Sequence, residues 1–179
     1  MKKVAIIGSV GIPASYGGFE TLAEQLAVRL QDRFDLTVYC SRQAFSRRPK
    51  KIGKVSLRYL PFNANGIQSI PYDMWSILSA VRYADTLLIL GVGGCTLLPL
   101  LRWFGCRKRV VVNVDGIEWR RAKWSAPVRR YLKFAEKCAV KYADAIIGDN
   151  QVIVDYVRNT YHRPCELIEY GADTVKMEE

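Results

Sequence analysis

The chain has 179 residues, of which 50% are hydrophobic and 25% are charged, a composition typical of one globular domain with a sizeable core. Lys and Arg number 27 against 17 Asp and Glu, which leaves a formal net charge of +10. Such an excess indicates an anionic partner, such as a phosphorylated small molecule, a membrane surface or nucleic acid. The sequence contains no motif of a known DNA or RNA reader, so we expect no nucleic-acid partner.

The cysteine and histidine content argues against a disulfide framework and against a metal site. The 5 cysteines are scattered without a CxxC pair, and His162 is the single histidine. We therefore expect buried free thiols in a reducing cytosol and no bound metal. Residues 86–101 carry no charge, but they are too few for the ~20 apolar residues that cross a bilayer. Because glycines and Pro99 interrupt them, they are predicted as a strand, a glycine turn and a helix.

The stretch from residue 4 to residue 33 organises the rest of the chain. The apolar run 4–7 predicts a buried strand, and a glycine-rich loop at 8–18 follows it. From Phe19 onward, apolar residues recur at i, i+3, i+4 and i+7, which predicts an amphipathic helix. The first amides of such a helix point back at the strand end and form an anion site where glycine lets a ligand approach.

Gly17 and Gly18 are the candidate phosphate-binding residues of this loop. The alternative is that two glycines only let the helix pack close to the sheet, but the loop is longer than packing requires. Glu20 lies in the first helical turn, where a carboxylate either complements the helix dipole or contacts a ligand. The glycine spacing is neither the dinucleotide fingerprint G-x-G-x-x-G nor a P-loop.

Beyond residue 33, short apolar runs alternate with amphipathic segments. Strands are predicted at 36–40, 55–60, 86–90, 110–114, 145–147 and 165–168, and helices at 72–83, 95–104, 127–142 and 150–161. Residues 41–54 are polar and strongly basic and are predicted as a loop. The alternation predicts an α/β fold, a doubly wound, mostly parallel, Rossmann-like sheet of about seven strands with helices on both faces.

Ligands of such sheets bind outside the carboxyl ends of the strands. The predicted site therefore combines the loops 8–18, 91–94, 115–124 and 148–150. The loop 115–124 is chemically the densest, with two carboxylates, Asp115 and Glu118, and two tryptophans, Trp119 and Trp124, among its cations. Carboxylates bind hydroxyls or transfer protons, and tryptophan packs on the apolar face of a sugar. The alternative is an ion-paired loop with Trp119 folded into the core.

Two further features leave alternatives open. Ser41 and Arg42 follow the second predicted strand, where they suit the 2′-phosphate of NADP, so an NADP-dependent oxidoreductase is one alternative. The predicted helix 127–142 carries a basic face opposite an apolar one, which is either a solvated face over a core or a surface that holds anionic lipid. We predict Arg129, Arg130, Lys133 and Lys137 to face a membrane; a non-catalytic membrane-docking module is the second alternative.

Residues 12–21 and 115–119 together resemble bacterial glycosyltransferases of the retaining, GT-B-fold family 4, in the branch of capsule and exopolysaccharide rhamnosyltransferases. Residues 168–173 resemble the stretch where those enzymes pass into their second domain. The resemblance implies that residues 1–169 are a Rossmann-like, acceptor-side domain of GT-B fold. Residues 170–179 would begin a linker to a carboxyl-terminal, donor-binding domain, without which the 179 residues are expected to be inactive.

The resemblance also implies which residues act. Gly17 and Gly18 face the donor phosphates, and Asp115 or Glu118 orients or deprotonates the acceptor; family members often carry a histidine where this chain has Asp115. The acceptor would contact Tyr16, Glu20, Gly93, Gly94, Gly116 and Trp119. The partners implied are a nucleotide-sugar donor, a lipid-linked or oligosaccharide acceptor and an anionic membrane, with no cofactor. The protein would be cytoplasmic and peripheral on the inner face of the cytoplasmic membrane.

Overall fold

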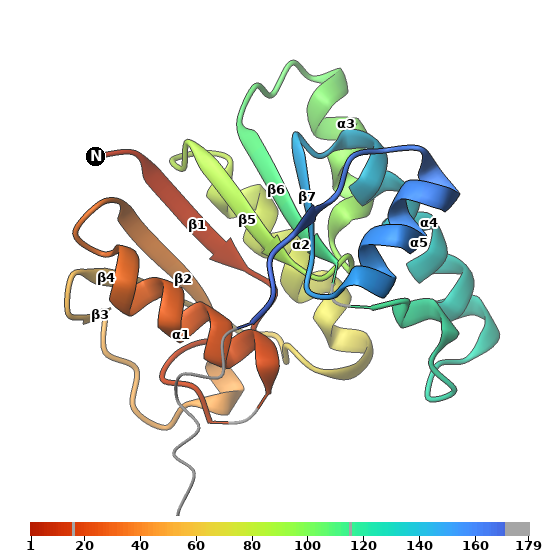
Figure 1. The fold of residues 1–179 in the computed structure, drawn as a ribbon. Coiled ribbons are helices and arrows are strands. Elements are labelled where there is room, and N and C mark those ends of the chain that lie inside the picture. The colour runs from red at the N-terminus through yellow and green to blue at the C-terminus, as the bar shows by residue number, and fades with distance from the viewer. Residues whose placement is uncertain (16, 115, 171–179) are drawn as a thin grey trace, which may run out of the picture.

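The computed structural model describes residues 1–15, 17–114 and 116–170. Its strands are β1 (Lys3–Ile7), β2 (Asp35–Ser41), β3 (Lys51–Ile52), β4 (Val55–Leu60), β5 (Thr86–Leu90), β6 (Arg109–Val114), β7 (Ala145–Gly148) and β8 (Glu166–Leu167). They form one 8-stranded sheet in the order β3-β4-β2-β1-β5-β6-β7-β8 (Figure 1). All neighbours pair in parallel except β3 and β4. The predicted α/β fold with a mostly parallel sheet is confirmed.

The α-helices connect these strands. They are α1 (Gly18–Leu30), α2 (Ser69–Ala80), α3 (Leu98–Trp103), α4 (Ala126–Tyr142) and α5 (Gln151–Tyr161). Short 3₁₀ turns lie at η1 (Arg42–Ala44), η2 (Gly66–Gln68), η3 (Cys95–Leu97) and η4 (Glu118–Arg120). Helix α2 begins earlier than predicted because Pro71 lies in its first turn, where a missing N–H group costs no intrahelical hydrogen bond.

The basic segment 41–54, predicted as a loop, contains the additional strand β3. Lys51 and Ile52 pair antiparallel with Ser56 and Val55, and Gly53 takes the positive φ of +56° that the turn between them needs. Both residues of β3 are exposed. An exposed strand of this length lacks an apolar pattern, so the sequence offers no signal for it.

The two faces of the sheet pack on different helices. Side chains of α2, α3, α4 and α5 share one buried cluster with Ala5 and Ile7 of β1. Helix α1 packs on the opposite face, in a second cluster that contains Ile6. Figure 1 shows α1 on the near side of the sheet and α2 behind it. Because successive residues of a strand point to opposite faces, burial on both faces explains the unbroken apolar runs of the strands.

The expectation for residues 86–101 holds, and four of the five thiols are buried as expected. All five cysteines are free, and only Cys106 is not fully buried. Residues 86–101 form β5, a glycine turn, η3 and the start of α3. Within the ranges that the structure describes, no helix is both long enough and apolar enough to span a bilayer.

The order in which strands are added to the sheet changes direction between β1 and β5. From β1 the chain moves outward to β2 and β4, and α2 then returns it to β5 on the other side of β1. Gly8, at the end of β1, has a φ of +96°, and a Cβ there would overlap the carbonyl oxygen of Leu90. This close approach brings the loops after β1 and β5 together at the switch point, where ligands of open α/β sheets bind.

Candidate functional site

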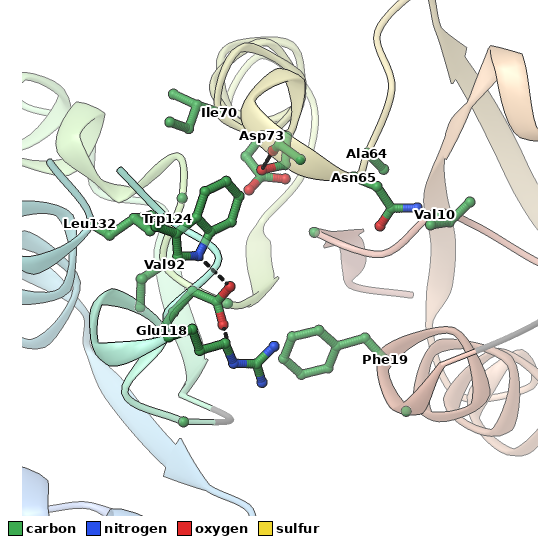
Figure 2. Close-up of a pocket in the computed structure, with 18 of the residues that line it drawn as sticks. Val10, Phe19, Ala64, Asn65, Ile70, Asp73, Val92, Glu118, Trp124 and Leu132 are labelled. Carbon is green, nitrogen blue, oxygen red and sulfur yellow. Dashed lines mark hydrogen bonds and ion pairs between the residues drawn. The ribbon is translucent and has the colours of Figure 1, made fainter. Parts of the chain in front are cut away.

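A pocket of about 480 Å³ lies at this switch point. Its walls come from the loop after β1 and the start of α1, from η2 and α2, and from the loops after β5, β6 and β7. Figure 2 shows Glu118 and Trp124 on one side of it, Phe19 and Asn65 on the other, and Asp73 reaching in from α2. All four loops predicted to form the site line this pocket.

The glycine loop contributes the amino-terminal end of α1. Gly17 precedes the helix with a φ of +115°, and no side chain caps the helix at this position. Gly18, the first helical residue, lines the pocket. Glu20 is 8% exposed, and its Oε1 accepts a hydrogen bond of 2.9 Å from the Val10 amide. Glu20 therefore holds the loop in shape as well as lining the pocket. Tyr16 lies outside the described residues.

The loop after β6 is closed on itself by Glu118. Its Oε2 lies 2.9 Å from Nε of Arg121, while its Oε1 lies 3.0 Å from Nζ of Lys123. The same Oε1 accepts a hydrogen bond of 2.9 Å from Nε1 of Trp124. Three donors thus share the two oxygens of this carboxylate. Gly116 lines the pocket beside it, and Asp115, the other predicted catalytic residue, lies outside the described residues.

Trp119 does not line this pocket. Its Nε1 donates to Oε1 of Glu136 at 3.4 Å, and Nζ of Lys133 lies 4.7 Å from the centre of its ring. Glu136 is completely buried in α4 and also accepts hydrogen bonds of 2.6 Å from the hydroxyls of Tyr156 and Tyr161. This network ties the loop after β6 to α4 and α5. Contact of Trp119 with an acceptor stays a prediction.

Gly93 and Gly94 bring the turn after β5 against α2. A Cβ at Gly93 would lie 2.7 Å from Oδ2 of Asp73, and a Cβ at Gly94 would lie 2.8 Å from the Asp73 backbone and Cβ. Only Gly93 of the pair lines the pocket. The hydroxyl of Tyr131 donates to the Gly93 carbonyl at 2.8 Å and fixes this turn on α4.

Asp73 belongs to the wall formed by η2 and α2, which the sequence analysis missed. It is 6% exposed, and burial raises the pKa of its carboxyl from 3.8 to about 8. The sequence did contain a signal for Asp73, which is its spacing from other residues on the buried side of α2. Those residues follow at i+3, i+4 and i+7: Ser76, Ile77 and Ala80. A carboxylic acid at that spacing lies on the side of the helix that faces the core.

The loop after β7 supplies a further carboxyl group. Asp149 lines the pocket, and burial raises the pKa of its side chain. Its Oδ1 accepts a hydrogen bond of 2.8 Å from Nδ2 of Asn150, which in turn caps α5. Carboxyl groups from four different segments of the chain thus meet in the pocket of a protein with a net charge of +10.

The geometry gives no support to a dinucleotide at Ser41 and Arg42. Ser41 is fully buried and donates its hydroxyl to the Phe62 carbonyl at 2.9 Å. Neither residue lines the pocket. Among the residues that the structure describes, no group of three His, Cys, Asp or Glu side chains is placed to hold a metal ion.

The residues predicted to face a membrane lie on the exposed side of α4. Arg129, Arg130, Lys133 and Lys137 are all exposed. Arg129 also donates to the carbonyls of Trp119 and Arg120, at 3.1 and 3.3 Å, so it braces the neighbouring loop. Large apolar side chains are exposed as well: Phe134 on α4 is 57% exposed, and Trp103 and Phe104 at the end of α3 are 87% and 77% exposed.

Comparisons with known proteins agree with the fold. A sucrose-phosphate synthase from Thermosynechococcus elongatus is similar in structure, with a TM-score of 0.70 at 12% sequence identity. The likeness covers 96% of this chain but only 49% of the synthase, so the chain spans about half the length of that protein. No match was found among curated proteins. A family model described as a domain of unknown function, DUF1972, matches residues 1–173, and the chain belongs to this family.

Proposed function

We propose that this chain is the acceptor-binding half of a retaining glycosyltransferase of the GT-B fold. The observation that carries the proposal is the pocket at the switch point between β1 and β5, which joins uncapped helix amides to several carboxyl groups. The likeness in fold to half of a sucrose-phosphate synthase supports it. Residues 171–179, predicted to belong to a linker toward a donor-binding domain, lie outside the described residues.

The donor phosphates would meet the amino-terminal end of α1. The first amides of a helix are free to bind an anion, and Gly17 and Gly18 place no side chain between them and a ligand. Negative charge that develops on the departing diphosphate would be stabilised there by dipoles already in position. The remainder of the donor would be held by the second domain.

The acceptor would occupy the part of the pocket between α2 and the loop after β6. Asp73, Glu118 and Asp149 suit hydroxyl groups, because carboxyl oxygens accept the hydrogen bonds that hydroxyls donate. Ile70, Leu132 and Trp124 add apolar surface at this end, which Figure 2 shows on the side of Val92. A sugar, with polar edges and apolar faces, fits such a wall. Asp115 remains a proposed acceptor-orienting residue.

The finer part of the proposal is transfer of a sugar, rhamnose by resemblance, to a lipid-linked or polysaccharide acceptor in capsule or exopolysaccharide synthesis. A lipid-linked acceptor would place the protein on the inner face of the cytoplasmic membrane. Two exposed features support this docking: the cations of α4, which attract anionic headgroups, and the aromatic rings of Trp103 and Phe104, a type of side chain that sits at the lipid boundary.

The test of transferase activity uses the full-length protein and a panel of UDP-, GDP- and dTDP-sugars, with a lipid extract of its host as acceptor. We expect release of the nucleoside diphosphate with one class of donor, and no comparable release by residues 1–179 alone. Turnover by residues 1–179 at the full-length rate would contradict the half-site proposal. Tight NADPH binding, followed by fluorescence, would instead favour the oxidoreductase.

Docking is tested by sedimentation with phosphatidylglycerol vesicles. Replacing Trp103 and Phe104 together by Ser should weaken binding about tenfold, because two interfacial aromatic side chains are lost. Val152→Ser is the matched control, since Val152 is 73% exposed on α5. Equal sedimentation of both variants and the unmodified protein would contradict the assignment of this surface.

A further inference from the structure

Among the residues that the structure describes, no partner is found for Asp73, unlike the other carboxyl groups of the pocket. Glu20 accepts from the Val10 amide, Glu118 from Trp124, and Asp149 from Asn150. Within the described ranges, no hydrogen bond or ion pair reaches the Asp73 carboxyl, and burial is the cause of its raised pKa. A buried carboxyl group without a partner costs stability, so a purely structural role does not explain it.

The surroundings of Asp73 leave its carboxyl accessible from the pocket. The segment opposite it is the turn after β5, which has glycine at both 93 and 94. A Cβ at Gly93 would lie 2.7 Å from Oδ2 of Asp73 and would cover that oxygen. The side chain lines the pocket although it is only 6% exposed. A carboxyl group that is buried in the protein but lines the pocket suits contact with a ligand.

We propose that Asp73 is a catalytic residue that binds the hydroxyl of the acceptor and takes its proton. The proposal rests on the transferase function proposed above. In the transfer step, the bond from the anomeric carbon of the donor to the phosphate oxygen breaks, and its electron pair leaves with the nucleoside diphosphate. A bond forms from the anomeric carbon to the acceptor oxygen on the same face that the diphosphate leaves, so the anomeric configuration is retained, and the proton of that oxygen moves to the Asp73 carboxylate.

Glu118 is less suited to this task. Its oxygens already accept from Arg121, Lys123 and Trp124, which occupy its lone pairs. A base that works near neutral pH needs a pKa close to that range and a free oxygen. Asp73 meets both conditions, with a pKa of about 8.

The groups that face Asp73 do not titrate in the same range. Tyr72 on α2, Cys95 in η3 and Tyr131 on α4 each interact electrostatically with Asp73, and burial raises the pKa of all three above their usual values. They therefore keep their protons at pH 8. Across the pocket, Arg121 and Lys123 both pair with Glu118, which offsets one of their two positive charges. A change in activity near pH 8 would accordingly report Asp73.

The test compares Asp73→Asn with the unmodified full-length protein, using whichever sugar nucleotide of the UDP, GDP and dTDP panel is turned over. We expect kcat for transfer to the lipid extract to fall about 100-fold or more, with the KM for the donor unchanged. The kcat of the unmodified protein should rise with pH up to about 8. This rise should be missing in the variant.

A second variant and a control separate chemistry from folding. Gly93→Ala retains Asp73 but places a methyl group against its carboxyl, so it should also lose transfer. Ser76→Ala changes a buried residue of the same helix that does not line the pocket, and it should stay within about threefold of the unmodified rate. Asp73→Asn with an unmodified rate and pH profile would overturn the inference. No turnover of any donor by the unmodified protein would refute the transferase function itself.

Discussion

The raised pKa of Asp73 has a consequence for stability that is measurable without any substrate. Its carboxyl titrates at about 8 in the folded chain, against 3.8 as the ordinary value. Between these two pH values the folded state binds more protons than the unfolded state, so stability falls as pH rises through this window. At about 1.36 kcal/mol for each pKa unit, the loss from pH 5 to pH 8 is roughly 4 kcal/mol.

Replacing Asp73 by Asn removes this titration. Asn cannot ionise, so Asp73→Asn should gain stability relative to the unmodified chain as pH rises from 5 to 8, by up to roughly 4 kcal/mol. Urea unfolding of both proteins at several pH values measures the difference, and other titrating groups cancel in it. A difference that stays constant between pH 5 and pH 8 would show that the carboxyl is ionised in the folded protein and would refute the reasoning.

Three further substitutions test the architecture of the site. Gly17→Ala should destabilise the chain by at least about 1 kcal/mol in urea unfolding, because its φ of +115° disfavours a side chain and the added Cβ overlaps the Glu20 carboxylate; a neutral effect would contradict this loop geometry. Glu136→Ala should cost roughly 3 kcal/mol in the same assay, since it removes a buried acceptor from three partly buried donors; an unchanged midpoint would be inconsistent with the network. Glu118→Gln should weaken the ion pairs of its loop and, in the proposed transfer reaction, lower kcat less than Asp73→Asn does; the reverse order of the steady-state rates would assign the base role to Glu118.

The fold class was predictable because its signals are local. Buried parallel strands are apolar on both faces, and amphipathic helices repeat with a period close to 3.6 residues, so both are visible in short windows of sequence. The strand β3 was not predictable, because its exposed residues pair only once β4 is in place. The general position of the site followed from the fold, since ligands bind at the carboxyl ends of parallel strands.

The identity of individual site residues was harder to predict. Trp119 and Trp124 lie in the same polar loop with cations beside both, yet only Trp124 lines the pocket. Glu136, distant in the sequence, makes the difference by accepting the indole hydrogen of Trp119. A contact of this kind depends on how α4 packs against the loop, and no local pattern encodes it. Asp73 was more predictable than Trp119, because its spacing from Ile77 and Ala80 on α2 is visible in the sequence.

The contact between Asp73 and the turn after β5 also restricts which substitutions relatives can accept. With Oδ2 of Asp73 2.7 Å from the position of a Cβ at residue 93, an acid at 73 and a side chain at 93 would compete for the same space. Members of the family that acquire alanine or serine at the position of Gly93 should therefore have lost the acid at position 73. The pair would then vary together, and an alignment that contained both changes would separate members that keep this carboxyl from members that lack it.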